Sequence, residues 1–378
     1  MTQLSVVIPT KNEENSIGIC IEKIQKVFND NHIDGEIIVA DNSIDNTPEI
    51  ARNLEAKVIM PDKLGYGNAY RFGFEEATGD YIVMGDGDGT YDFFDMPKLL
   101  APLRKGEADL VLGSRFRGEI KKGAMPWHHQ YIGNPFLTRL FNKANKSTIS
   151  DTHSGYRAFT REAYEKIRTG LKTTGMEFAS EMLEISIMHG LRIAEVPITY
   201  YPRPEGSAPN LHSFSDGWRH LKHILLRAPT LLFLIPGFIF FALGMLLVVL
   251  IWNPFNLWVP MFGIHSMIAG CLLAMVGYQI IFLGLFAKTY GVHLGLKKRD
   301  RITEFVSKHI TLGRGATVGL VIFLVGFVYT LHLLLNWIGS GYADLPVLDQ
   351  DIAGLTLLVI GLQTIFYSFF LSVIGGEE

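Results

Sequence analysis

Two aspartates that are one residue apart, Asp86 and Asp88, are the side chains of this chain best suited to bind a metal ion. They stand in residues 85–92 (GDGDGTYD), where glycines let the backbone approach a ligand closely. Carboxylate oxygens are hard ligands, and a pair of them suits Mg²⁺ or Mn²⁺ that bridges phosphate oxygens. Because such a pair occurs by chance in most proteins, its significance depends on its place in the fold.

Two other acidic segments, residues 9–14 (PTKNEE) and 41–47 (DNSIDNT), also follow short runs rich in β-branched residues. Strands are expected at residues 4–8, 36–40, 57–60, 81–84 and 109–112, and helices at 15–28, 48–54 and 70–77. This alternation predicts an α/β fold with a mainly parallel sheet covered by helices. Ligands of such sheets bind outside the carboxyl ends of the strands, where the three acidic segments are expected to meet.

Charge is distributed unevenly along the chain. Of the 34 basic and 37 acidic residues, which give a net charge of −3, only 14 lie between Thr230 and the C-terminus. The near-neutral total excludes a strongly basic nucleic-acid-binding protein and an acidic disordered chain. The hydrophobic content of 48% and the mean hydropathy of +0.22 are high for a soluble enzyme. We therefore predict a soluble globular domain over residues 1–212 and a membrane domain over residues 230–378.

The C-terminal part contains four apolar stretches, each long enough to cross a bilayer, which needs about 20 residues. They cover residues 230–252, 265–287, 315–337 and 352–374, and none contains Asp, Glu, Lys or Arg. Four transmembrane helices are therefore expected. Since charges within the membrane usually mark ion or substrate paths, an anchoring and lipid-presenting role is favoured over transport.

The connections between these stretches predict an orientation. Residues 288–314 contain seven basic side chains, whereas the other two connections contain none. By the positive-inside rule the basic connection is cytoplasmic, which also places the catalytic domain and both termini there. The start of the chain carries no secretory signal, in agreement with this expectation. Within the junction at residues 213–229, residues 215–227 (SDGWRHLKHILLR) predict a basic amphipathic helix in the cytoplasmic headgroup region.

The order of the motifs resembles that of a known family. Over residues 4–203 the chain contains, in sequence, VVIPTKNEE, IIVADNSIDNT, KLGYGNAYRFGFEEATGDYIVMGDGDG and DTHSGYRAF. As an ordered set these segments are similar to family 2 glycosyltransferases of the GT-A fold. More narrowly, they resemble the dolichyl- and polyprenyl-phosphate hexose synthases, some of which carry C-terminal membrane spans.

The resemblance implies a donor site built from the acidic segments. Asp86 and Asp88 would hold Mg²⁺ or Mn²⁺ on the diphosphate of a nucleotide sugar, and Asp41 would bond the nucleotide base. The other nucleotide-binding residues that the resemblance implies are Pro9, Asn12, Glu13, Asp45, Lys63 and Gly65.

The resemblance also implies an acceptor site for a polyprenyl or dolichyl monophosphate. Arg117, Arg157, Arg203 and Glu181 would lie near the acceptor phosphate, and Arg115, Arg157 and Asp151 would join the two metal-binding aspartates as catalytic residues. Arg115 is expected just after the fifth strand. Arginines bind phosphate in a bidentate manner. A phosphate monoester, with a second pKa of about 6, is already a nucleophile at neutral pH. Asp151 is therefore favoured as a residue that orients the phosphate or an arginine over a general base, and both roles remain open.

Three positions depart from the family pattern. Asn42 follows Asp41 where many members have a second aspartate, and Thr90 stands where mannose synthases commonly have glutamine. The second departure leaves the third metal ligand open. Residues 208–210 (APN) lack the basic residue that the family places after Gly-Ser, which leaves the acceptor side and the donor sugar open.

The expected reaction is metal-dependent, inverting transfer of a hexose from a donor of the UDP-glucose or GDP-mannose type to the lipid monophosphate. Residues 127–145 are expected on the acceptor side, near the membrane. One alternative is a related membrane glycosyltransferase that elongates a polysaccharide or glycolipid, although the QxxRW motif of such enzymes does not occur here. Another is a catalytically silent nucleotide-binding membrane scaffold. A homo-oligomer remains possible.

Overall fold

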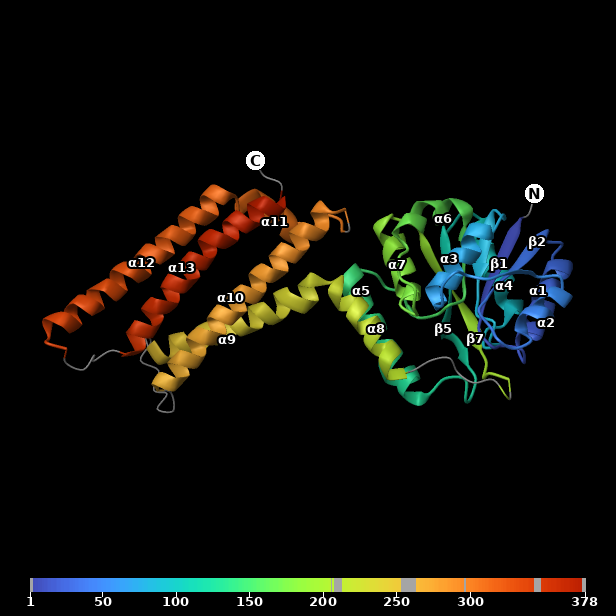
Figure 1. Ribbon diagram of the computed structural model, residues 1–378, viewed down its shortest axis with the longest axis horizontal. Coiled ribbons are helices and arrows are strands. Elements are labelled where there is room, and N and C mark those ends of the chain that lie inside the picture. The colour runs from blue at the N-terminus through green and yellow to red at the C-terminus, as the bar shows by residue number, and fades with distance from the viewer. Residues whose placement is uncertain are drawn as a thin grey trace. The chain divides into compact units, whose positions relative to one another are not determined.

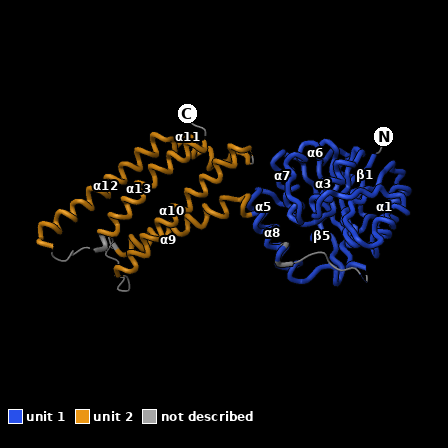
Figure 2. Tube along the Cα trace, viewed as in Figure 1, with its two compact units in different colours: residues 1–224 blue, residues 225–378 orange. Residues whose placement is uncertain are grey.

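The computed structural model describes residues 3–204, 206, 213–252, 263–295, 297–342 and 348–375. The chain forms two compact units, residues 1–224 and 225–378 (Figure 2). The first unit contains a β-sheet with helices on it, and the described part of the second is helical (Figure 1). The boundary falls inside helix α8 (Ser213–Leu226), whose Ile224 packs in a core of the first unit.

Seven strands form one mainly parallel sheet in the order β3-β2-β1-β4-β6-β5-β7. They are β1 (Leu4–Thr10), β2 (Gly35–Asp41), β3 (Lys57–Ile59), β4 (Tyr81–Met84), β5 (Leu110–Ile120), β6 (Arg157–Thr160) and β7 (Ile193–Tyr200). Only β6 runs antiparallel to its neighbours, β4 and β5. The mainly parallel sheet expected from the sequence is therefore confirmed.

The helices of the first unit are α1 (Ile17–Asp30), α2 (Thr47–Asn53), α3 (Tyr66–Glu76), α4 (Met96–Arg104), α5 (Asn134–Asn145), α6 (Arg161–Ile167) and α7 (Phe178–Met188). Short 3₁₀ or π turns cover Phe93–Asp95, His129–Gly133 and Arg168–Gly170. Helix α3 begins four residues earlier than expected, because Gly65, in a conformation with φ of +137°, starts the helix directly after the turn.

Two hydrophobic cores lie on opposite faces of the sheet. Alternate residues of β1 enter different cores: Val6 packs with α1 and α4, whereas Val7 packs with α3, α6 and α7. This follows from the two-residue period of a strand, which points successive side chains to opposite faces. Burying one such side chain contributes about 1.5–3 kcal/mol, and so the alternation fixes which face of the sheet each side chain of the strand occupies.

Strand β5 differs from the expected short strand at 109–112. It continues to Ile120, with a register shift against β7 between Ser114 and Glu119. Arg115 and Arg117 therefore lie on the strand and not in a loop after it. The polar composition of this second half conceals the strand, because its partner is β7, more than seventy residues along the chain.

The second unit contains four helices that are long and apolar enough to cross a membrane. They are α9 (Ile235–Trp252), which follows a π turn at Thr230–Leu234, α10 (Ile264–His293), α12 (Leu312–Gly339) and α13 (Leu348–Gly375). A short amphipathic helix, α11 (Arg301–His309), lies in the basic connection and begins with a capping box between Asp300 and Thr303.

Glycines pack these helices in two pairs. The closely packed glycines, seven residues apart on each helix, are Gly237 and Gly244 of α9, Gly270 and Gly277 of α10, Gly319 and Gly326 of α12, and Gly354 and Gly361 of α13. At Gly244 and Gly277, for example, a Cβ atom would collide with backbone of the opposite helix. Small residues allow this close approach, which replaces the hydrophobic driving force that is missing inside a bilayer.

Candidate active site

The carboxyl ends of β1, β2 and β4 bring the three acidic segments together. In the parallel register Thr10 lies beside Asp41, and β4 pairs with the other side of β1. The Thr10 hydroxyl donates a hydrogen bond of 2.7 Å to Asp41, which is 1% exposed. Pro9, half-buried one residue earlier on β1, pairs with Ala40. The strand order thus places the acidic segments at one edge, as ligand sites of such sheets require.

The loops after β1 and β2 are joined by hydrogen bonds. Asn12, which adopts a positive φ of 59°, donates its backbone N–H to the Ser43 hydroxyl at 2.7 Å and accepts from the Ile44 N–H at 3.0 Å. Asp45 accepts bonds from the Thr47 hydroxyl and from the backbone of Glu14. Asn12 and Asp45 therefore shape the loops, whereas their contact with a nucleotide remains a prediction.

Asp88 uses its two oxygens differently. Its Oδ1 accepts hydrogen bonds from the backbone N–H and the hydroxyl of Thr90, at 3.0 and 2.6 Å. Its Oδ2 lies 2.6 Å from Nη2 of Arg203. Thr90, which stands where mannose synthases commonly have glutamine, thus orients the Asp88 carboxylate in this structure.

Two tyrosines of α3 lie close to Asp86. The Tyr70 hydroxyl donates a hydrogen bond of 2.9 Å to Oδ1 of Asp86. Burial, and then the nearby Asp88 carboxylate, raises the pKa of Asp86 to about 6. Neither tyrosine was predicted at this site, since only the fold brings α3 under the loop after β4.

Glu13 is the third carboxylate of the cluster. It is 5% exposed, and burial followed by the charge of Asp88 raises its pKa to about 7. The Ser16 hydroxyl donates a hydrogen bond to the Gly87 carbonyl at 2.8 Å and lies 3.2 Å from a Glu13 carboxylate oxygen, which joins the two acidic loops. Arg203 Nη1 lies 3.8 Å from Glu13, so one guanidinium faces two carboxylates.

The donor set at this edge fits a divalent cation shared with a ligand. Within the described ranges, no group of three or more His, Cys, Asp or Glu side chains has the geometry of a self-contained metal site. Asp86 and Asp88 supply two carboxylates, which is the usual protein share where Mg²⁺ keeps waters and binds substrate phosphates. The residues therefore fit a cation bound together with a diphosphate.

A glycine turn before α3 packs against the segment that precedes α7. The Gly67 N–H donates to the Thr174 carbonyl at 2.9 Å, and a Cβ atom on Gly65 or Gly67 would strike the carbonyls of Thr174 and Thr173 respectively. Lys63 is exposed, and its carbonyl accepts a bond from Asn68. The tight turn is thus built from backbone contacts.

Glu181 holds this segment from inside. It is fully buried, and its Oε2 accepts hydrogen bonds from the backbone N–H groups of Lys172 and Thr173 at 2.9 and 2.8 Å and from the Thr173 hydroxyl at 2.7 Å. These contacts make Glu181 a positioning residue for the glycine turn. Its expected place near an acceptor phosphate remains a prediction.

Asp151 and Arg115 form a buried bidentate pair. The Arg115 Nε and Nη2 atoms lie 2.7 and 2.8 Å from the two carboxylate oxygens, and the Arg115 N–H donates to the same carboxylate at 3.1 Å. Asp151 is 0% exposed and Arg115 6%. The guanidinium also lies over the Tyr200 ring, 5.2 Å from its centroid. Asp151 therefore orients an arginine in this structure.

The other expected arginines differ in exposure. Arg157 is fully buried: it donates to the carbonyls of Ser154 and Thr152 at 3.0 and 3.2 Å, and burial lowers its pKa to about 10. Arg117 is half-exposed and pairs with Glu195 at 2.7 Å. Arg157 thus braces the loop before β6, whereas Arg117 and the 20% exposed Arg203 can reach a ligand. The departure at residues 208–210 lies outside the described residues.

Helix α8 contributes a contact that the sequence did not reveal. The His220 ring packs edge-on against the His153 ring, 4.5 Å between centroids, and His220 bonds the Ser180 hydroxyl at 3.2 Å. His153 belongs to the same loop as Asp151. The helix that precedes the membrane spans therefore touches the loop that holds the Asp151–Arg115 pair.

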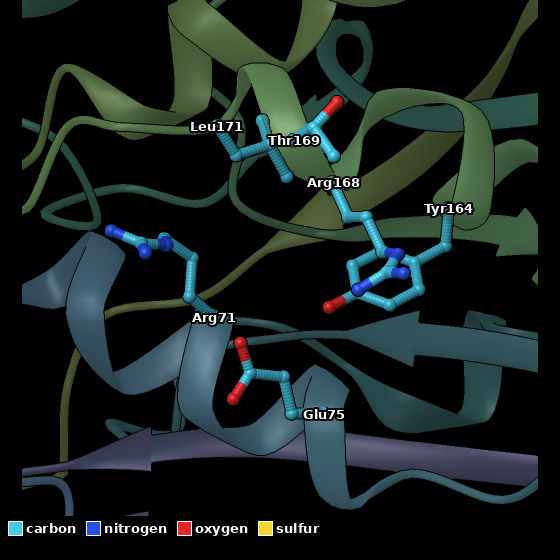
Figure 3. Close-up of a pocket in the computed structure, with 6 residues that line it drawn as sticks. All are labelled: Arg71, Glu75, Tyr164, Arg168, Thr169 and Leu171. Carbon is cyan, nitrogen blue, oxygen red and sulfur yellow. The ribbon is translucent and has the colours of Figure 1, made fainter.

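A shallow pocket elsewhere on the first unit is lined by Arg71, Glu75, Tyr164, Arg168, Thr169 and Leu171 (Figure 3). Arg71 and Glu75 come from α3, and the other residues come from α6 and the segment after it. The pocket shares no residue with the carboxylate cluster.

Comparison with known proteins identifies two family regions. Residues 5–168 match the family described as "Glycosyl transferase family 2", and residues 285–375 match "Glycosyltransferase family 2 C-terminal transmembrane region". The second match covers α11, α12 and α13.

Two relatives come from Haloferax volcanii. The low-salt glycan biosynthesis hexosyltransferase Agl6 is 46% identical over 372 residues, which cover 98% of this chain and 89% of the relative. A dolichyl-phosphate hexose transferase is 35% identical over 216 residues, 57% of this chain and 89% of the relative. Among solved structures, glucosyl-3-phosphoglycerate synthase from Mycobacterium tuberculosis with Mn²⁺, UDP and glucosyl-3-phosphoglycerate has a TM-score of 0.47 and 25% identity, covering 60% of this chain and 80% of that chain.

The match to Agl6 covers 98% of this chain, and so it includes both family regions. Along this chain, the sheet with its acidic edge precedes the four apolar helices. The chain therefore belongs to glycosyltransferase family 2 and is a membrane glycosyltransferase with a GT-A-like N-terminal domain.

Proposed function

We propose that this enzyme transfers a hexose from a nucleotide sugar, of the UDP-glucose or GDP-mannose type, to a polyprenyl or dolichyl monophosphate. The observation that carries the proposal is the Asp86–Asp88 pair at the carboxyl edge of the sheet, in a chain with four helices that are able to cross a membrane. The names of two relatives, a hexosyltransferase and a dolichyl-phosphate hexose transferase, support it.

The donor would lie along the acidic edge. Asp41 is buried at the end of β2, where it would accept a hydrogen bond from the base, and the glycine turn at Gly65 would pass under the nucleotide. Asp86 and Asp88 would hold Mg²⁺ or Mn²⁺ on the diphosphate, and this ion would neutralise the leaving group. The chain's own part is to present both carboxylates rigidly, through Tyr70 and Thr90.

The acceptor would need positioning more than activation. Its phosphate arrives mostly as a dianion near neutral pH, because its second pKa is about 6. The protein must then hold one anion close to another. Arg117 and Arg203 are accessible enough to bind phosphate oxygens, while Asp151 fixes the buried Arg115. Direct attack by the phosphate oxygen on the anomeric carbon breaks the bond to the diphosphate and inverts that centre.

The lipid-facing side would combine two surfaces of the first unit. Trp127, Tyr131 and Phe136, which are 67%, 70% and 55% exposed, lie in or just before α5, and Trp218 of α8 is 61% exposed. Aromatic residues favour the headgroup region, and basic residues of α8 would favour its anionic lipids. With the basic connection at residues 288–314 on the same side, the catalytic domain and both termini would be cytoplasmic.

The test uses the full chain in nanodiscs that contain polyprenyl phosphate. Radiolabelled UDP- and GDP-sugars are added one at a time, with and without EDTA, and organic-soluble label is counted. We expect one donor to label the lipid, EDTA to prevent it, and Asp88→Ala to abolish it, while Asp30→Ala, an exposed acidic residue at the end of α1, retains activity. Accumulation of water-soluble polymer without labelled lipid would contradict the proposal.

A further inference from the structure

Only one carboxylate oxygen of Asp88, Oδ2, is not bonded to Thr90, and Arg203 contacts this oxygen. Oδ1 is occupied by the N–H and hydroxyl of Thr90, at 3.0 and 2.6 Å. Oδ2 lies 2.6 Å from Arg203 Nη2, within the range of a charge-assisted hydrogen bond. The oxygen best placed for a metal ion is therefore the one that the guanidinium contacts.

The same guanidinium reaches a second acidic residue. Arg203 Nη1 lies 3.8 Å from Glu13, and both carboxylates are less than one tenth exposed. Buried carboxylates that lack a nearby cation destabilise a fold, because their charge loses its hydration. Arg203 thus supplies, in the ligand-free protein, part of the positive charge that this site requires.

The backbone of Arg203 is anchored beside the loop that it neutralises. Tyr201 donates its N–H to the Thr90 carbonyl at 2.9 Å, and the Pro204 ring packs against Gly89, whose added Cβ would lie 3.1 Å from it. The Arg203 side chain is 20% exposed, so one side of it meets solvent. The head group can therefore leave Asp88 while its backbone stays in place.

On the basis of the proposed function, we infer that Arg203 is a counter-ion that holds Asp88 before the divalent cation binds and is displaced from it when the cation arrives. A cation on Oδ2 and a guanidinium on the same oxygen would be two positive charges in contact, and they repel each other. The exchange keeps the negative charge of Asp88 neutralised both before and after the cation binds. It also weakens binding of the cation alone, so that the cation enters together with the diphosphate of the donor.

The first experiment measures Mn²⁺ binding to the full chain without nucleotide, from the electron paramagnetic resonance signal of free Mn²⁺. Arg203→Gln removes the competing guanidinium, and we expect its Kd for Mn²⁺ to fall about tenfold, a change that corresponds to about 1.4 kcal/mol. The matched control is Lys23→Gln, which removes a cation paired with Asp92 in the same acidic loop, at 3.1 Å. Its Kd should stay within about twofold of the parent value, the size expected for a screened charge at longer range. An equal fall in both variants, or none in Arg203→Gln, overturns the inference.

The second experiment needs no variant and so does not depend on folding of a mutant. Phenylglyoxal modifies accessible guanidinium groups, and peptide mass spectrometry reports the modification at each arginine. Mn²⁺ alone should increase modification of Arg203 severalfold and leave the buried Arg115 unmodified. Unchanged or reduced modification of Arg203 at saturating Mn²⁺ means that the pair with Asp88 persists, which contradicts displacement.

Asp88→Ala separates this inference from the proposed function. If Asp88→Ala binds Mn²⁺ as tightly as the parent chain, the metal site itself is misplaced and the proposed function loses its main support. If Asp88→Ala abolishes Mn²⁺ binding while Arg203→Gln leaves the affinity unchanged, the metal site stands and only the exchange is wrong.

Discussion

Asp151 binds the Nε–Nη2 edge of the Arg115 guanidinium through both carboxylate oxygens, at 2.7 and 2.8 Å, and neither residue is more than 6% exposed. A carboxylate in this position directs a charged donor and has no oxygen left facing solvent. The sequence left two roles for Asp151 open, that of an orienting residue and that of a general base. The geometry favours the orienting role.

Breaking this pair should cost more than a surface ion pair. Asp151→Ala leaves Arg115 charged and buried without its partner, and we expect the free energy of unfolding to drop by about 3–5 kcal/mol. Thermal and denaturant unfolding of the full chain in detergent measures this, with Asp30→Ala as the exposed control.

The pH profile of Asp151→Asn then distinguishes the two roles. An orienting residue lowers kcat but leaves the shape of the acidic limb unchanged, because it does not exchange a proton with the acceptor. Loss of the acidic limb in this variant would instead identify Asp151 as a base.

Glu181 should affect binding of the nucleotide sugar. Glu181→Ala removes the acceptor of three hydrogen bonds from Lys172 and Thr173, and so releases the segment against which Gly67 packs. We expect KM for the nucleotide sugar to rise about tenfold, a loss of about 1.4 kcal/mol, with KM for the lipid phosphate nearly unchanged. Steady-state kinetics with each substrate varied in turn measures the two constants. A rise confined to the lipid phosphate would place Glu181 at the acceptor, as the family resemblance implies.

The ionised Asp86 carboxylate lowers the stability of the fold at neutral pH, although the proposed metal site needs it. Its pKa is raised to about 6, so the folded state binds a proton more tightly than the unfolded state between about pH 4 and 6. Stability from this group is therefore present at low pH and is lost as the pH rises through 6. Asp86→Asn should raise Tm at pH 7.5 by about 2–4 °C without metal, and abolish transfer. The Tm gain should shrink at pH 5; a gain that is equal at both pH values would show that ionisation of Asp86 is not its cause.

His153 should make stability depend on pH in the opposite direction from Asp86. Burial, and then the charges of His220 and Arg115, holds the pKa of His153 well below its ordinary value. The folded state binds fewer protons than the unfolded state below pH 6.5, so stability is lost as the pH falls. His153→Phe keeps a ring against His220 and should reduce the fall in Tm between pH 7 and 5, measured against His32→Phe, an exposed histidine. An identical fall in both variants would exclude His153 as the titrating group.

The parts of the fold that depend on local patterns were predictable. The alternation of strands and helices placed Asp41, Asp86 and Asp88 at one edge of the sheet, because parallel strands end on the same side. Apolar length alone predicted the four membrane helices. These features follow from short-range periodicity, which a single sequence displays directly.

The partners of the charged residues were not predictable, because they lie far along the chain. Glu195 of β7 pairs with Arg117, and Arg203 pairs with Asp88, which lies far earlier in the chain, in the loop after β4. Arg157 follows the SGY segment in the expected order, yet the antiparallel strand β6 draws its guanidinium into the interior. Residue types and spacing identify which groups are charged; only the packing of distant elements decides which of them meet a ligand.

The glycine spacing in the membrane unit affects how the chain is assembled. Two pairs of helices pack through matched glycines: α9 with α10, and α12 with α13. In each pair, the second helix is the next candidate membrane span along the chain. A nascent hairpin of this kind can close as soon as its second helix leaves the ribosome and enters the bilayer, before the later helices are made. Biogenesis would then proceed in two steps, and the first hairpin would hold the finished catalytic domain at the membrane while the second is still being synthesised.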